Sequence, residues 1–164
     1  MLSLIPTEPA DLPEIVRLEH HPENMEYILP YSLSRHQQAL ESKDEVHLKL
    51  MTADGSLAGF VLLAGRENPH SAVEFRRVVV SLKGMGYGRQ AIRLVKEYCF
   101  ERLMCHRLWL DVFEDNARAR YLYSSEGFVE EGIMRECIKQ KGLYRNLVLM
   151  SILQSEYLNP TPLS

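Results

Sequence analysis

The pattern of hydrophobic positions near the start of the chain predicts a short strand and then a helix. The apolar run Leu2–Ile5 is typical of an edge strand. Farther along, Leu12 and Ile15 recur at helical spacing, and Asp11 and Glu14 stand where a capping box places its two side chains. We therefore expect a helix that Asp11 caps.

The stretch that follows is polar and is interrupted by prolines. Residues His20–Tyr31 contain Pro22 and Pro30, which indicates an irregular or briefly helical segment. A second helix is expected after this segment, with Ser34 as its cap and an end near Ser42.

Alternation of apolar and polar residues then takes over, which is the pattern of half-buried strands. Asp54-Gly55 is a strong hairpin signal between the first two of them. Two more helices are expected, one of roughly 15 residues after a glycine-rich segment and one over 116–125 that ends before Gly127. The predicted strands are Val46–Met51, Leu57–Ala64, Ala72–Val80, Leu108–Phe113, Phe128–Ile138 and Leu143–Leu153.

This order of elements predicts an α+β fold, with a mixed sheet and helices on both of its faces. The 164 residues fit one domain over 1–164 that is long enough to bury a sizeable core. No repeat or long linker divides the chain, and residues 159–164 are expected to form a frayed tail.

Composition excludes several classes of protein. With 46% hydrophobic residues, 19 basic and 22 acidic side chains, the chain is neither disordered nor basic enough to indicate a nucleic-acid binder. No apolar run approaches a membrane helix, and the first residues lack the basic region of a signal peptide. The spacing of Cys99, Cys105 and Cys137 fits neither zinc nor disulfides, so we expect buried thiols, no metal and a cytoplasmic protein.

The strongest local signal is a glycine-rich loop, Lys83–Gly88, between a Val-rich strand and a helix. Glycines and the free N–H groups of a new helix form a site that suits phosphates, and Lys83 and Arg89 add flexible positive charge. The loop lacks the Gly-Lys-Ser/Thr sequence of a P-loop, and Arg89 stands where a dinucleotide fingerprint needs glycine. A nucleotide-binding module is therefore disfavoured.

Two motifs together resemble one known family. Lys83–Gly88 resembles the Arg/Gln-x-x-Gly-x-Gly/Ala loop of the GCN5-related N-acetyltransferases (GNAT), with Lys83 in place of Arg or Gln. Asn116–Ala119, Leu122-Tyr123 and Gly127-Phe128 resemble the family's second motif with its spacing kept. The C-terminal portion is most similar to the ribosomal-protein and spermidine N-acetyltransferase branch.

The resemblance implies a mostly antiparallel sheet of about seven strands with a central splayed parallel pair. Acetyl-CoA would lie in the V-shaped gap between the strands Ala72–Val80 and Leu108–Phe113. Backbone groups would hold its pantetheine arm and pyrophosphate, and the Asn116 side chain would bind near the thioester. The implied cofactor-binding residues are Val78, Val80, Lys83, Met85, Gly86, Gly88, Arg89 and Asn116.

The resemblance also implies the chemistry, in which a neutral amine attacks the thioester directly. Tyr123 stands where the family places the general acid that protonates the leaving thiolate, whereas Tyr121 points to another face. Glu74 is the candidate base, directly or through water, unless it is only a partner of Arg76 or Arg107.

Three other side chains near these strands remain alternatives of lesser weight. Asp111 and Glu114 could serve as the base or orient a cationic amine. His106 is expected to cap or pack at the start of its strand.

In this fold the acceptor site is lined by the early helices and the last hairpin. Glu26 and Tyr27, with Glu23 and Asn24 beside them, suit a cationic amine such as a polyamine, a protein N-terminus or another small amine. A non-catalytic acyl-CoA-binding regulator is the alternative function. Exposed strands in the final hairpin could support a homodimer.

Charge is unevenly distributed along the chain. Residues 1–75 contain 5 basic and 12 acidic side chains, whereas residues 76–107, which include the glycine loop, contain 8 basic and 2 acidic ones. The positive segment therefore coincides with the expected place of a polyanionic cofactor, and the negative one with that of a cationic amine.

Overall fold

A computed structural model of the protein describes residues 1–81 and 83–162. It contains one seven-stranded sheet in the order β1-β2-β3-β4-β5-β7-β6. Within the described residues, β4 and β5 form the one parallel pair, so the expected mixed and mostly antiparallel sheet is confirmed. The strands are β1 Ser3–Pro6, β2 Val46–Met51, β3 Leu57–Ala64, β4 Ala72–Val80, β5 Arg107–Phe113, β6 Val129–Gln140 and β7 Leu143–Leu153.

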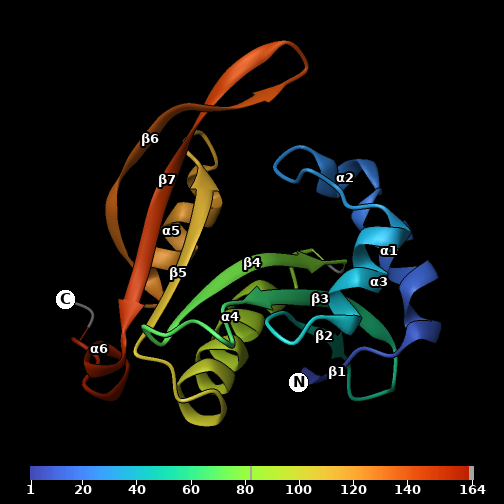
Figure 1. Ribbon diagram of the computed structural model, residues 1–164, viewed down its shortest axis with the longest axis horizontal. Coiled ribbons are helices and arrows are strands. Elements are labelled where there is room, and N and C mark those ends of the chain that lie inside the picture. The colour runs from blue at the N-terminus through green and yellow to red at the C-terminus, as the bar shows by residue number, and fades with distance from the viewer. Residues whose placement is uncertain (82, 163–164) are drawn as a thin grey trace.

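Helices cover the sheet on two sides (Figure 1). Apolar residues of α4 (Tyr87–Glu97) and α5 (Ala117–Ser125) pack into the main core on one face. Leu12 and Ile15 of α1 (Leu12–Glu19) pack on Phe60 and Val79 at the other face. The remaining elements are α2 Pro22–Met25, α3 Leu33–Glu41, α6 Gln154–Leu158, a 3-10 turn at Pro9–Asp11 and a π-helical turn at Tyr98–Arg102.

Of the two predicted helix caps, Asp11 is the N-cap residue of α1 as expected but makes no capping hydrogen bond to that helix, and Ser34 is wrong. Asp11 ends the 3-10 turn, where its carboxylate accepts a hydrogen bond from the Glu8 backbone N–H at 2.8 Å and pairs with Lys49. The second helix is capped by Ser32, whose hydroxyl accepts from the Arg35 N–H at 3.1 Å, not by Ser34. The Ser32 hydroxyl, two residues before the predicted cap, thus gives a partner to a backbone N–H of the first turn that no carbonyl of the helix can reach.

The sheet splays where β4 and β5 part (Figure 1). The two strands pair only from Ala72 with Arg107 to Glu74 with Trp109. Directly beyond Glu74, the pairing with β3 skips Arg76, which is the extra residue of a β-bulge. The bulge places Phe75 and Val78 on the main core while Val79 faces α1. A V-shaped gap thus opens from Glu74 onward.

The C-terminal hairpin projects beyond the rest of the sheet (Figure 1). Lys141 and Gly142, both at positive φ, form its turn as expected. Strand β6 is an edge strand exposed over most of its length, and Cys137 on it is exposed rather than buried as predicted; Cys99 and Cys105 are buried. The short helix α6 was not predicted, and residues 163–164 of the expected frayed tail lie outside the described residues.

No helix in the described ranges combines the length and apolar character needed to cross a membrane.

Candidate active site

The glycine loop ends in a helix start with free backbone donors. Gly84 and Gly86 have φ values of +77° and +72°, a region that favours glycine, and open space surrounds both positions. Gly86 is the N-cap of the 11-residue helix α4, and no side chain caps it. The N–H groups of the first turn, including those of Gly88 and Arg89, are therefore available to an anion.

Two cations lie at this loop, and only one of them was expected. Lys83 is exposed, and partial desolvation together with the positive charge of Arg118 lowers its pKa from the usual value. Arg118, in the first turn of α5, thus brings a second positive charge to the loop. Its place in the motif Asn116–Ala119 was the signal that could have identified it.

The side chain of Arg89 does not supply flexible charge, contrary to expectation. Its guanidinium donates to Ser125 Oγ at 2.9 Å and pairs with the buried Glu126 at the end of α5. Arg93 and Lys96 pair with the same carboxylate. The pKa of Glu126 lies below its usual value: burial raises it, but the hydrogen bonds from Arg93 and Arg89 and the nearby charges outweigh burial. Arg89 therefore ties α4 to α5.

Glu74 lies at the vertex of the V, in the last parallel pair. Its Oε2 accepts from Arg76 Nη2 at 2.7 Å, and Arg76 also pairs with Glu45 at 3.0 Å. Burial and then the negative charge of Glu74 raise the pKa of Asp111 on β5. The carboxylates of Glu74 and Asp111 therefore lie on the same face of the two strands that part, with Arg76 and Arg77 near them.

Tyr123 approaches the gap from the opposite face of the sheet. Its ring packs edge-on against Phe75 at 6.1 Å and Phe128 at 5.5 Å. Burial and then the charge of Asp111 raise the pKa of its phenol, which makes no hydrogen bond to any described residue. Tyr121, by contrast, is 73% exposed and points away. The phenol of Tyr123 thus remains protonated and free to donate.

Asn116 is the N-cap of α5. Its Oδ1 accepts from the Ala119 N–H at 3.2 Å, which leaves the amide nitrogen as the group that can bind a ligand. His106 contributes its backbone to the sheet: its N–H donates to Ser71 O at 2.8 Å, and its side chain is exposed. The structure thus gives His106 no packing role.

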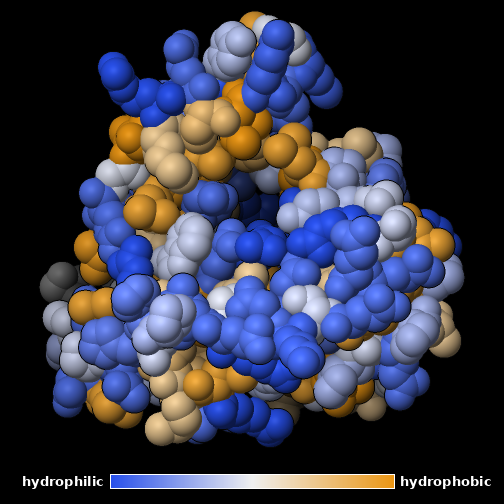
Figure 2. Space-filling view, in the orientation of Figure 1, coloured by the Kyte–Doolittle hydropathy of each residue, from blue (hydrophilic) through white to orange (hydrophobic). Residues whose placement is uncertain are grey.

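The early helices and the last hairpin meet at the wide end of the gap. The ring of Tyr27 lies 6.3 Å from that of Phe113 at the end of β5, and the backbone oxygen of Glu26 faces Arg145 of β7. Asn24 is buried and bonds to Leu18 O at 2.7 Å, which makes it structural. Figure 2 shows a hollow between the hairpin and α2, with hydrophobic side chains gathered above it.

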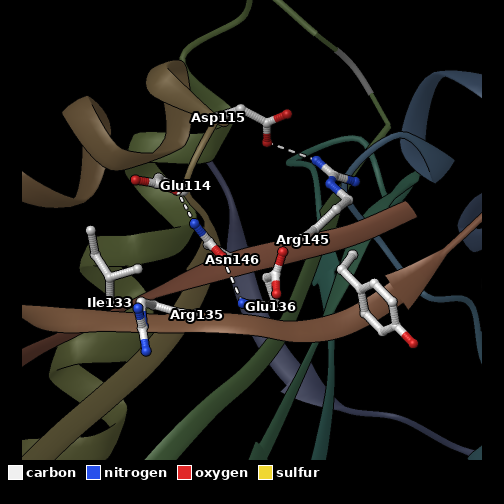
Figure 3. A pocket seen from close by; sticks show the side chains of 8 residues that line it. Glu114, Asp115, Ile133, Arg135, Glu136, Arg145 and Asn146 are labelled. Carbon is white, nitrogen blue, oxygen red and sulfur yellow. Dashed lines mark hydrogen bonds and ion pairs between the residues drawn. The ribbon is translucent and has the colours of Figure 1, made fainter.

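A cavity of about 890 Å³ opens on the hairpin side of this region (Figure 3). It is lined by the residues that follow β5 and by the facing parts of β6 and β7, with a mixture of acidic and basic side chains. Glu114 Oε2 accepts from Asn146 Nδ2 at 2.7 Å, so this alternative base is held away from the vertex.

The sequence pattern of the acetyltransferase (GNAT) family matches residues 12–128, well over half of the chain. The chain belongs to this family. It is an acetyl-CoA-dependent N-acetyltransferase. The acetyltransferase is 30% identical over 170 residues to a spermidine N(1)-acetyltransferase of Vibrio cholerae serotype O1, and the match covers 96% of each chain.

Solved structures agree with this assignment. A crystal structure of spermidine N-acetyltransferase from Vibrio cholerae in complex with CoA and spermine matches the acetyltransferase with a TM-score of 0.87 and 31% identity, over 96% of this chain and 98% of that chain. A dodecameric structure of spermidine N-acetyltransferase from the same organism matches with a TM-score of 0.84 and 30% identity, over 98% of both chains. The fold expected from the resemblance is therefore confirmed.

A buried polar chain beside the acetyltransferase site was missed by sequence reasoning. His36 lies 2.9 Å from Glu19 Oε1 and 3.0 Å from His47, whose other ring nitrogen lies 2.9 Å from Thr7 Oγ1. Glu19 also pairs with Arg77 at 2.6 Å. These residues are far apart in the sequence, and no local spacing could have brought them together.

Among the described residues, no cluster of ligands could hold a metal ion.

Ion pairs also change the interpretation of the charge distribution. Most basic side chains of the segment 76–107 are paired: Arg76 with Glu74, Arg77 with Glu19, and Arg107 with Glu131. Together with the cluster on Glu126, these pairs leave little of the segment's positive charge for a cofactor. The charge near the glycine loop comes from Lys83 and Arg118.

Proposed function

We propose that the acetyltransferase transfers the acetyl group of acetyl-CoA to a primary amine by direct attack in a ternary complex. One observation carries the proposal: Glu74 and Tyr123 reach the same gap from opposite faces of the sheet, where β4 and β5 part. A base and an acid on opposite sides of a reacting centre are what acyl transfer to an amine needs.

The reaction follows from these positions. The amine nitrogen attacks the thioester carbonyl and loses a proton to Glu74, directly or through water. The carbon–sulfur bond breaks, and the thiolate takes the proton of the Tyr123 phenol, whose raised pKa keeps it protonated at neutral pH. The products are the N-acetylated amine and free CoA, and the phenol is then reprotonated from solvent.

The backbone beyond the vertex suits the cosubstrate. Past Glu74, β4 has no partner on its β5 side within the described residues, which leaves backbone groups of Val78 and Val80 for the pantetheine amides. The N–H groups of Met85, Gly86, Gly88 and Arg89 would hold the pyrophosphate, with Lys83 beside them. The free amide nitrogen of Asn116 would bind the arm near the thioester.

The acceptor enters between α2 and the hairpin, where Glu26 and Tyr27 lie. Relatives named spermidine N-acetyltransferases support an alkyl amine. A polyamine, a protein N-terminus and another small amine all present the same reacting group.

A second copy of the chain is the partner that the hairpin suits. Strand β6 is an exposed edge, and large apolar side chains stand exposed along the hairpin: Val129, Ile133, Met134, Leu143 and Tyr144. The dodecameric relative supports self-association.

An acceptor screen tests the proposed function. Free CoA is measured while acetyl-CoA is mixed with polyamines, small monoamines and peptides with free N-termini, and products are identified by mass. We expect thiol release that requires an amine, with an equimolar acetylated product. Tight binding of acetyl-CoA without turnover on any amine would instead favour a non-catalytic acyl-CoA-binding regulator.

A further inference from the structure

The residues 26–31 that follow α2, here called the acceptor segment, are held at both arms of the V. At one end the ring of Tyr27 lies 6.3 Å from that of Phe113 at the end of β5. At the other end the guanidinium carbon of Arg77, on β4, lies 4.1 Å from the ring centre of Tyr31. The acceptor segment, which carries both proposed acceptor residues, thus bridges the two strands that part.

Arg77 also holds the backbone of the acceptor segment. Its Nη1 donates to the backbone oxygen of Leu29 at 2.7 Å and to Glu19 Oε2 at 2.6 Å. The other carboxylate oxygen of Glu19 accepts from the Tyr31 backbone N–H at 2.8 Å. Glu19 is fully buried and the side chain of Arg77 is only 11% exposed, so water competes little for these bonds. One buried ion pair therefore fixes two backbone groups of the segment.

The arrangement depends on the shape of the guanidinium as well as on its charge. A planar guanidinium can pair with a carboxylate and lie over an aromatic ring at the same time. A lysine at position 77 would keep a positive charge beside Glu19, but it has no planar group to lie over Tyr31. The charge and the anchoring of the segment can therefore be separated by substitution.

We propose that Arg77 is a positioning residue for the acceptor amine: together with Glu19 it fixes the acceptor segment across the gap and so sets KM for the amine. The inference rests on the proposed function, because Glu26 and Tyr27 meet the amine only if it reacts in this gap. Arg77 acts through the segment, so its loss should weaken amine binding while the glycine loop and the Tyr123 phenol stay in place.

The test measures kcat and KM for spermidine and for n-butylamine at saturating acetyl-CoA, together with the acetyl-CoA dissociation constant. In Arg77→Lys we expect KM for both amines to rise about tenfold, while kcat and the dissociation constant change by less than about twofold. Arg35→Lys is the matched control: the Arg35 guanidinium also lies over the Tyr31 ring, at 5.1 Å, but it pairs with Glu45 instead of Glu19. Its amine KM should equal that of the unmodified protein.

A second readout follows the acceptor segment itself. A protease that cleaves after glutamate should cut at Glu26 faster in Arg77→Lys than in Arg35→Lys, because a released segment exposes its backbone. The fragment that ends at Glu26 is identified by mass.

Four results would overturn the inference: an unchanged amine KM in Arg77→Lys, an equal rise in Arg35→Lys, equal cleavage at Glu26 in the two variants, or a loss of acetyl-CoA affinity as large as the rise in KM. If Arg77→Lys does not fold, Tyr31→Leu decides, because it removes the ring and keeps the ion pair, and its amine KM should still rise. Failure of the proposed function has a different signature, because the unmodified protein would then acetylate neither amine.

Discussion

Histidine 47 lies in the middle of the buried chain that joins Thr7 to Glu19. The carboxylate of Glu19 can only accept, so His36 Nε2 carries a hydrogen; with both rings neutral, His47 Nε2 then donates to His36 and Thr7 donates to His47 Nδ1. Burial, and then the mutual repulsion that a proton on each ring would bring between His47 and His36, lowers the pKa of His47 from 6.5 to about 4. Both ring nitrogens of each histidine therefore have a hydrogen-bond partner without an added proton.

This pKa predicts loss of stability in acid. The unfolded chain binds a proton at His47 near pH 6.5 and the folded protein only near pH 4, so the free energy of unfolding falls as the pH drops through that window. Between pH 7 and pH 4 the free energy of unfolding should fall by about 3 kcal/mol through His47. Urea titrations between pH 4 and 7 should show a shallower pH dependence for His47→Gln than for His70→Gln, an exposed control. Identical slopes would contradict the prediction.

A second prediction for a single residue concerns Glu74. As the proposed base, its replacement by Gln should lower kcat by about a hundredfold or more. Glu45→Gln is the matched control, because Glu45 pairs with the same Arg76 and lies outside the gap. Comparable losses of turnover in the two variants would show that only the position of Arg76 matters.

Single residues were predicted from the sequence to different extents. Tyr123 and Glu74 were named because a motif or a strand position marked them. Asn116 caps its helix through a residue 3 positions away, a local contact that a sequence motif can mark. Arg89 bonds to residues 36–37 positions away, which no local pattern can show. Glu19, His36 and His47 show no pattern, because only the folded α1, α3 and β2 bring them together.

The glycine loop is the element that binds the cosubstrate in our proposal. At Gly86 a glutamate would have to adopt a left-handed backbone conformation, which costs about 1–2 kcal/mol, and would place a negative charge beside a polyanion. Calorimetric titration of Gly86→Glu with acetyl-CoA should therefore show at least tenfold weaker binding, because the new carboxylate stands at the proposed pyrophosphate site and repels the cosubstrate.

Gly142→Glu is the matched control for that titration. Gly142 has φ +79° and open surroundings in the hairpin turn, so the backbone strain is the same and the loop is untouched. Equal affinities of the two variants for acetyl-CoA would remove the loop from the binding site.

Strands were predicted better than helix starts and irregularities. Strands β2, β3, β4 and β7 were predicted at the residues where the structure has them: alternation marked β2, the Asp54-Gly55 turn marked β3 as the returning strand, and β-branched residues marked β4. A bulge at Arg76 could not be located from the sequence, because alternation says nothing about the position of an inserted residue. Helix α6 is only five residues long and too short to show a period.

At the scale of the whole molecule, the arrangement of the strands brings distant residues together. The sheet order places β5 beside β4, and their divergence brings Tyr123 and Glu74, which belong to distant segments, to one gap. The uneven charge along the chain pointed to a polyanion near residues 76–107, but ion pairs neutralise most of that segment. Linear charge counts cannot show such pairs, because the partners lie elsewhere in the sequence.

The central claim is that acetyl transfer takes place in this gap with Tyr123 as the acid. The most direct test measures kcat and the acetyl-CoA dissociation constant for Tyr123→Phe beside Tyr121→Phe, whose side chain is exposed on the same helix. We predict that Tyr123→Phe lowers kcat by about a hundredfold or more while acetyl-CoA affinity changes little, and that Tyr121→Phe behaves as the unmodified protein. Equal turnover of the two variants would contradict the claim.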